Sequence, residues 1–120
     1  LREADHIVVY DTAGLFSAAR TWWMFRTMGA QRVQVLDGGL PAWRADGGHV
    51  EAGPVIAQPT GFRARFAPDA VADLEAVRHA LGRFPVLDAR AEARFRGEAP
   101  EPRPGLRAGH MPGALNLPFK

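Results

Sequence analysis

The sequence contains no cysteine. Disulfide bridges, thiolate metal sites and a cysteine nucleophile are therefore excluded within these 120 residues. Histidine is scarce as well, and the four histidines, His6, His49, His79 and His110, lie too far apart for a local pair of metal ligands. We expect no metal and no cofactor.

The chain also lacks long apolar runs and has a single lysine. No apolar run approaches the ~20 residues of a membrane-spanning helix, and no charged and apolar leader is recognisable, so we expect no membrane partner and a cytoplasmic location. Fourteen of the fifteen cationic side chains are arginine, and the formal net charge is only +2. This balance favours planar recognition of small anions and argues against a nucleic-acid partner.

The first half of the chain has an α/β pattern. Residues 6–10 (HIVVY) and 32–36 (RVQVL) predict short strands, and residues 17–28 between them predict a helix that Gly29 ends. A second helical turn follows in LPAWRADGG, where Pro41 suits the first helical position. The order β-α-β-α implies a parallel sheet with helical crossovers.

The second half of the chain follows an extended linker at 51–68, in which residues 62–66 are expected to form one edge strand. Asp73 is expected to cap a helix that runs through Leu81. Residues 84–88 (FPVLD) predict a strand, residues 97–113 a long loop, and residues 114–117 a last short strand.

Two long segments carry a family resemblance. VVYDTAGLFSAARTWWMFRTMGAQRVQVLDGGLPAW and RFRGEAPEPRPGLRAGHMPGALNLPF resemble the two-domain sulfurtransferases of the rhodanese and 3-mercaptopyruvate sulfurtransferase family. The resemblance implies a rhodanese-like parallel sheet flanked by helices. Residues 1–50 would be the second half of an inactive N-terminal domain, 51–68 the interdomain linker, and 69–120 the first half of the C-terminal domain. Because the chain begins at Leu1 and lacks the remaining halves, we expect a fragment.

Asp11 stands where the resemblance places the cysteine of a catalytic domain. A carboxylate cannot accept sulfane sulfur, because that chemistry needs a polarisable thiolate. We therefore expect no catalytic residue in this chain and no activity from the chain alone. Asp11 is expected to cap a structural turn, and a role in orienting a neighbouring domain is the alternative.

Arg94 and Arg103 match the two arginines that, by resemblance, hold the carboxylate or sulfonate end of the sulfur donor. A guanidinium is suited to this role because its planar donors pair bidentately with a carboxylate. The alternative for Arg94 is an ion pair with Glu92 or Glu98. Arg90 and Arg96 are expected to form a solvated or interdomain pair. His110 is expected to pack on, or hydrogen-bond to, its own loop.

The resemblance implies part of a sulfurtransferase that moves sulfane sulfur from 3-mercaptopyruvate or thiosulfate to a thiol or cyanide through a cysteine persulfide. Its partners would be a small anionic sulfur donor and a thiol acceptor. The alternative is a catalytically inactive rhodanese-like binding or regulatory module. Because the two halves are complementary, they are also expected to close as one permuted domain, or to do so by exchange in a domain-swapped dimer.

Overall fold

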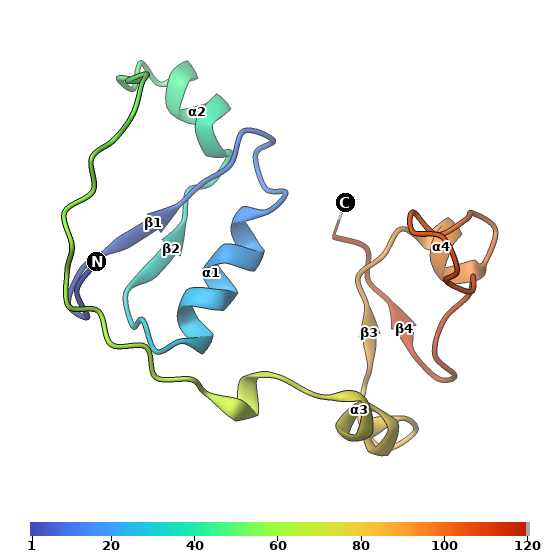
Figure 1. Ribbon diagram of the computed structural model, residues 1–120. Coiled ribbons are helices and arrows are strands. Elements are labelled where there is room, and N and C mark those ends of the chain that lie inside the picture. Colours follow the sequence, from blue (N-terminus) through green and yellow to red (C-terminus); the bar gives the residue numbers. More distant parts are fainter. Residues whose placement is uncertain (120) are drawn as a thin grey trace. The chain divides into compact units, whose positions relative to one another are not determined.

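The computed structural model describes residues 1–119, which fall into two compact units (Figure 1). The first unit is Leu1–Val71 and the second begins at Ala72. Each unit contains one two-stranded parallel sheet, β1–β2 in the first and β3–β4 in the second. Within the described part of the chain, no helix has both the length and the apolar character that a membrane crossing requires.

The first unit is a β-α-β-α arrangement, as the sequence predicts. Its elements are β1 (Ile7–Val9), α1 (Ala18–Thr27), β2 (Val33–Val35) and α2 (Gly39–Ala45), followed by a short 3-10 turn, η1 (Pro68–Ala70). β1 and β2 run parallel in the register Ile7↔Val33, and α1 packs against both strands (Figure 1). The helix is therefore the crossover that a parallel pair needs.

A small apolar core lies between α1 and its sheet. Ile7, Ala30 and Val33 are buried there, and Val9, Phe25 and Phe62 pack against them. The indole N–H of Trp22 on α1 donates to the carbonyl of Val33 (2.9 Å), which fastens the helix to β2. This contact joins a large aromatic side chain to the backbone of the strand beneath it.

Helix α2 begins two residues before Pro41, at Gly39, so the prediction that Pro41 opens this helix is wrong. The cause is the glycine pair at the start of the helix. Gly38 and Gly39 have φ angles of 68° and 58°. A Cβ atom on Gly39 would lie 2.5 Å from the carbonyl oxygen of Asp11. Only glycine fits this close approach, and it lets the chain turn into the helix earlier.

The edge strand expected at 62–66 is absent from the structure. This segment instead donates hydrogen bonds to the end of α1, from Arg65 N–H to the Met28 carbonyl (2.9 Å) and from Ala67 N–H to the Thr27 carbonyl (2.8 Å). The last carbonyls of a helix have no partner within the helix, and here they bind the passing segment. Gly29, with φ of 93°, ends the helix as predicted.

The second unit consists of α3 (Leu74–Ala80), β3 (Leu87–Asp88), α4 (Glu92–Arg96) and β4 (Leu115–Asn116). Asp73 caps α3 by accepting a hydrogen bond from Ala76 N–H (2.8 Å), which confirms that prediction. β3 and β4 run parallel in the register Leu87↔Leu115. In residues 72–119 no hydrophobic side chain is fully buried. Polar contacts therefore contribute more to holding the elements of this unit together than they do in the first unit.

In each unit the two neighbouring strands of a β-α-β stretch pair with each other. Closure of the two halves as one permuted domain, within one chain or by exchange in a swapped dimer, stays a prediction. So does the assignment of residues 1–50, 51–68 and 69–120 to parts of two rhodanese-like domains.

Candidate functional site

A cavity of about 750 Å³ lies in the second unit, at the carboxyl end of β3. Its walls come from β3, from α4 and from the loop at 97–113. The charged side chains that line it are those of Asp88, Arg90, Arg94, Glu101 and Arg107. The carboxyl end of a parallel strand is where α/β proteins commonly bind ligands.

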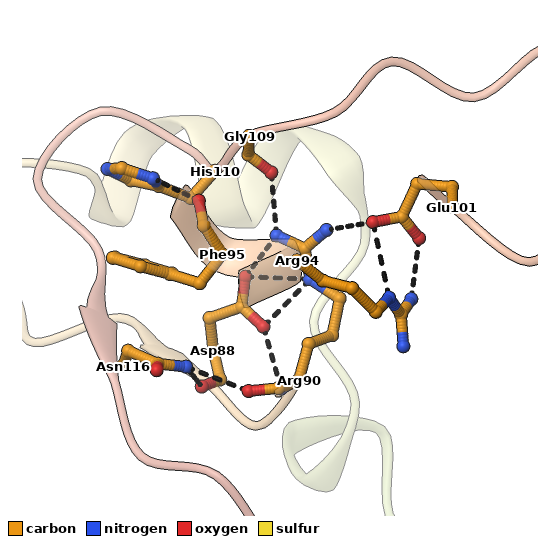
Figure 2. Close-up of polar contacts among 8 residues, drawn as sticks. All are labelled: Asp88, Arg90, Arg94, Phe95, Glu101, Gly109, His110 and Asn116. Atoms are coloured by element: carbon orange, nitrogen blue, oxygen red, sulfur yellow. Dashed lines mark hydrogen bonds and ion pairs between the residues drawn. The ribbon is translucent and has the colours of Figure 1, made fainter. Parts of the chain in front are cut away.

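Asp88, the last residue of β3, anchors the turn that follows the strand. Its carboxylate accepts hydrogen bonds from the backbone N–H of Arg90 (2.9 Å) and from the Nε and Nη2 of the Arg90 guanidinium (Figure 2). The hydrogen bond from the Arg90 side chain holds the pKa of Asp88 below its ordinary value. Asn116 on β4 donates to the carbonyls of Asp88 and Arg90 (2.9 Å each), which ties the turn to the neighbouring strand.

Arg90 is the centre of the polar network. Besides Asp88, its Nη1 donates to Glu101 (2.7 Å) and its Nη2 to the carbonyl of Gly109 (2.8 Å), so it holds two points of the 97–113 loop (Figure 2). These acidic partners raise the pKa of Arg90, the bond to Asp88 most strongly. The expectation that Arg90 forms a solvated or interdomain pair is wrong, because its partners all lie in its own unit and its side chain is 27% exposed.

Glu101 joins the two arginines at the cavity. Its side chain is 5% exposed, and its carboxylate accepts from Arg90 Nη1, from Arg94 Nε (3.3 Å) and from Arg94 Nη2 (2.5 Å). The hydrogen bond from Arg94, with the nearby positive charges, lowers the pKa of Glu101. Glu101 was not singled out from the sequence, because no local pattern links it to Arg90 or Arg94 across the loop.

Arg94 lines the cavity and presents a guanidinium that is only partly engaged. Its ion pair is with Glu101, so the expected pairing with Glu92 or Glu98 is wrong. Glu92 instead binds Arg96 one helical turn away (2.5 Å), and both side chains are exposed, as expected of a solvated pair for Arg96. Within the described residues Arg94 Nη1 has no hydrogen-bond partner, which leaves donors for a ligand.

Arg103 does not line the cavity, whereas Arg107 does. Arg103 lies exposed in the 97–113 loop, and its assignment as a substrate anchor stays a prediction. Arg107, which lies in the 97–113 loop, was not singled out from the sequence. The structure therefore brings Arg94 and Arg107 to the cavity and leaves Arg103 outside its lining.

His110 has a structural role, as predicted, but its partner is α4 and not its own loop. Its ring stacks on Phe95 with centroids 3.8 Å apart and planes 12° apart. Its Nδ1–H donates to the carbonyl of Phe95 (2.7 Å; Figure 2). The stack attaches the end of the 97–113 loop to α4, and both the loop and α4 contribute residues to the lining of the cavity.

Asp11, in the first unit, confirms the prediction of a capping role. Its carboxylate accepts four backbone hydrogen bonds, from Ala13 (3.0 Å), Phe16 (2.6 Å), Ser17 (2.8 Å) and Ala18 (3.0 Å). These bonds, led by that of Ala18, lower the pKa of Asp11 to about 2. The backbone of the loop that follows β1 therefore binds the carboxylate of Asp11. The side chain of Ser17, the N-cap residue of α1, makes no capping hydrogen bond.

Comparison with known proteins identifies the family. A model of the rhodanese-like domain matches residues 1–46. The 3-mercaptopyruvate sulfurtransferase of Escherichia coli K12 is 47% identical over 121 residues, which cover 99% of this chain and 43% of that enzyme. The human 3-mercaptopyruvate sulfurtransferase is 44% identical over 120 residues, covering 97% and 40% respectively.

A solved structure agrees. The crystal structure of SseA from Escherichia coli, described as a 3-mercaptopyruvate sulfotransferase with the rhodanese fold, superimposes with a TM-score of 0.85 and 42% identity over 98% of this chain and 44% of that one. The chain spans about two fifths of the length of the curated relatives above. The α/β fold expected from the sequence is confirmed, and the chain belongs to the rhodanese family.

Proposed function

We propose that this chain supplies the donor-binding part of a sulfurtransferase. The donor is a small anionic sulfur compound such as 3-mercaptopyruvate or thiosulfate, and the final acceptor is a thiol or cyanide. The observation that carries the proposal is Arg94, which lines a cavity of about 750 Å³ and keeps guanidinium donors unused. The names of the relatives support the same reaction class.

The role of these residues is to bind and orient the donor. The guanidinium of Arg94 pairs with the carboxylate of an α-keto acid, and Arg107 adds positive charge to the same cavity. Such positioning converts an encounter into an intramolecular reaction. In the transfer itself, a cysteine thiolate attacks the donor sulfur, the carbon–sulfur bond of 3-mercaptopyruvate breaks, and the leaving enolate takes a proton to become pyruvate.

The sulfur-accepting cysteine must lie outside these 120 residues, because the chain has none. The chain alone is therefore expected to give no sulfur transfer. The same absence favours the second candidate function, a rhodanese-like module that binds or regulates without catalysis. The four backbone bonds to Asp11 are consistent with that alternative, because they leave its carboxylate without a free role.

Titration of the chain with pyruvate tests the binding step. Pyruvate carries the α-keto carboxylate of the donor and has no reactive sulfur. We expect chemical-shift changes around Arg94, and affinity at least about tenfold weaker in Arg94→Ala, because a hydrogen bond to a charged group contributes about 1.5–3 kcal/mol. Arg96→Ala is the matched control, since Arg96 makes an exposed pair on the same helix. Binding that is unaffected by Arg94→Ala would contradict the proposal.

A chimera tests the catalytic step. In it, this chain replaces the matching 121 residues of the Escherichia coli 3-mercaptopyruvate sulfurtransferase. We expect turnover of 3-mercaptopyruvate, with a raised KM in the Arg94→Ala chimera. A folded chimera that binds pyruvate and transfers no sulfur would favour the inactive module.

A further inference from the structure

We infer that Glu101 is a positioning residue of the donor site, which aims the Arg94 guanidinium into the cavity. The inference rests on the proposed function, because it concerns how the same anion is bound. Glu101 touches no substrate in this role and acts through Arg94. Its carboxylate is the group in the cavity that binds two guanidinium groups at once.

The geometry of the contact fixes the orientation of Arg94. Glu101 engages Nε and Nη2, the same edge of the guanidinium, through both of its carboxylate oxygens. A two-point contact prevents rotation of the planar group, which a single hydrogen bond would allow. The opposite side, with Nη1, is therefore held in one direction and remains available to a second anion.

Glu101 is itself held in place by Arg90. Arg90 Nη1 donates to the Oε1 of Glu101, while its Nε and Nη2 are bound to Asp88 at the end of β3. The chain of contacts thus runs from β3 through Arg90 and Glu101 to Arg94 (Figure 2). With its side chain 5% exposed, Glu101 is screened from solvent, so an unpaired carboxylate there would be costly. Its charge is retained because both arginines neutralise it.

Simple electrostatics makes the opposite prediction. A carboxylate beside an anion site repels the anion, so Glu101→Gln should strengthen anion binding if Glu101 were merely a neighbouring charge. If Glu101 positions Arg94, the same substitution should weaken binding. The amide has one acceptor oxygen, so with that oxygen in the place of Oε1 its NH2 group faces Arg94 Nη2 and the two-point contact with Arg94 is lost. The sign of the change in affinity therefore separates the two roles.

The experiment compares pyruvate binding by the wild-type chain, Glu101→Gln, Glu101→Asp and the control Glu92→Gln. We expect Glu101→Gln to bind at least about tenfold more weakly, since small misplacement of an orienting group can cost up to about a hundredfold. Glu101→Asp keeps the charge on a shorter side chain and should recover part of the affinity. Glu92→Gln removes an equal charge from α4 and should bind as the wild type or slightly more tightly.

A second readout reports on orientation without ligand. The Nε–H resonance of Arg94 should be protected from exchange with water in the wild type and in Glu92→Gln, and unprotected in Glu101→Gln. If Glu101→Gln unfolds the second unit, the comparison is made with Glu101→Asp, for which affinity equal to the wild type would overturn the inference.

The outcomes separate this inference from the proposed function. Equal or tighter binding by Glu101→Gln, with weaker binding by Arg94→Ala, overturns the positioning role and leaves the donor site intact. Binding that Arg94→Ala does not weaken overturns both.

Discussion

The two units each place an aspartate at the carboxyl end of a parallel strand, and the two carboxylates are neutralised in different ways. After β1, Asp11 is bound by four backbone N–H groups. At the end of β3, Asp88 is bound by the guanidinium of Arg90. The four N–H groups that bind Asp11 are not free to bind a ligand, whereas the side-chain network around Glu101 leaves Arg94 Nη1 unused among the described residues.

The units also differ in what holds them together. The first has a buried apolar cluster of Ile7, Ala30 and Val33. In residues 72–119 no hydrophobic side chain is fully buried, and the ion pairs of Arg90 and Arg94 with Asp88 and Glu101 connect the elements instead. In the second unit the residues of the proposed binding site are therefore also its stabilising contacts, whereas the first unit is stabilised by apolar packing.

The largest expected effect comes from truncating the apolar core. Ile7→Ala should lower the free energy of unfolding of the first unit by about 2 kcal/mol or more, because it removes buried methyl groups and leaves a cavity. The matched substitution Leu87→Ala on β3, where the side chain is 58% exposed, should change the stability of the second unit far less. Urea denaturation followed by NMR signals of each unit measures both. Equal losses would contradict the difference between the units.

Arg90→Lys should loosen the second unit and spare the first. Lysine keeps the charge but lacks the planar donors that reach Asp88, Glu101 and Gly109 together. Amide exchange at the end of β4, where Leu117 N–H donates to the Asp88 carbonyl, should become on the order of tenfold faster. Arg96→Lys on the nearby helix α4 is the control, and unchanged exchange in Arg90→Lys would show that the network does not order this unit.

Acid should destabilise the first unit through Asp11. Its folded pKa of about 2 lies below the ordinary value of 3.8, so Asp11 contributes stability above pH 4 that is lost as the pH falls toward 2. Asp11→Asn should be less stable at neutral pH and should approach the wild type at pH 2. Thermal unfolding of the two proteins between pH 2 and 7 tests this. Parallel curves across that range would mean that the carboxylate is not held as described.

Local features were predictable from the sequence, and contacts across loops were not. The strands around Val8 and Gln34, the stop at Gly29 and the caps at Asp11 and Asp73 follow from short patterns, because each depends on neighbours within a few residues. The family resemblance extended this to the fold, which the comparisons confirm.

The partners of the arginines could not be predicted in the same way. Glu101 lies 11 residues from Arg90 and 7 from Arg94, and Gly109 lies 19 from Arg90, across a loop without periodicity. Glu92 and Glu98 lie closer to Arg94 in the sequence than Glu101 does, and only the path of the loop brings Glu101 to it. The start of α2 was misplaced for a related reason, since the contact of Gly39 with Asp11 spans 28 residues.

The central claim is that Arg94 in the second unit has a guanidinium donor left for an anion, whereas in the first unit the N–H groups of Ala13, Phe16, Ser17 and Ala18 are already bound to Asp11. Titration of the isotopically labelled 120-residue chain with pyruvate tests it most directly. We predict saturable shifts of the Arg94 side-chain resonances, with the amides of Phe16, Ser17 and Ala18 unchanged. Shifts at those three amides, or none at Arg94, would contradict the account.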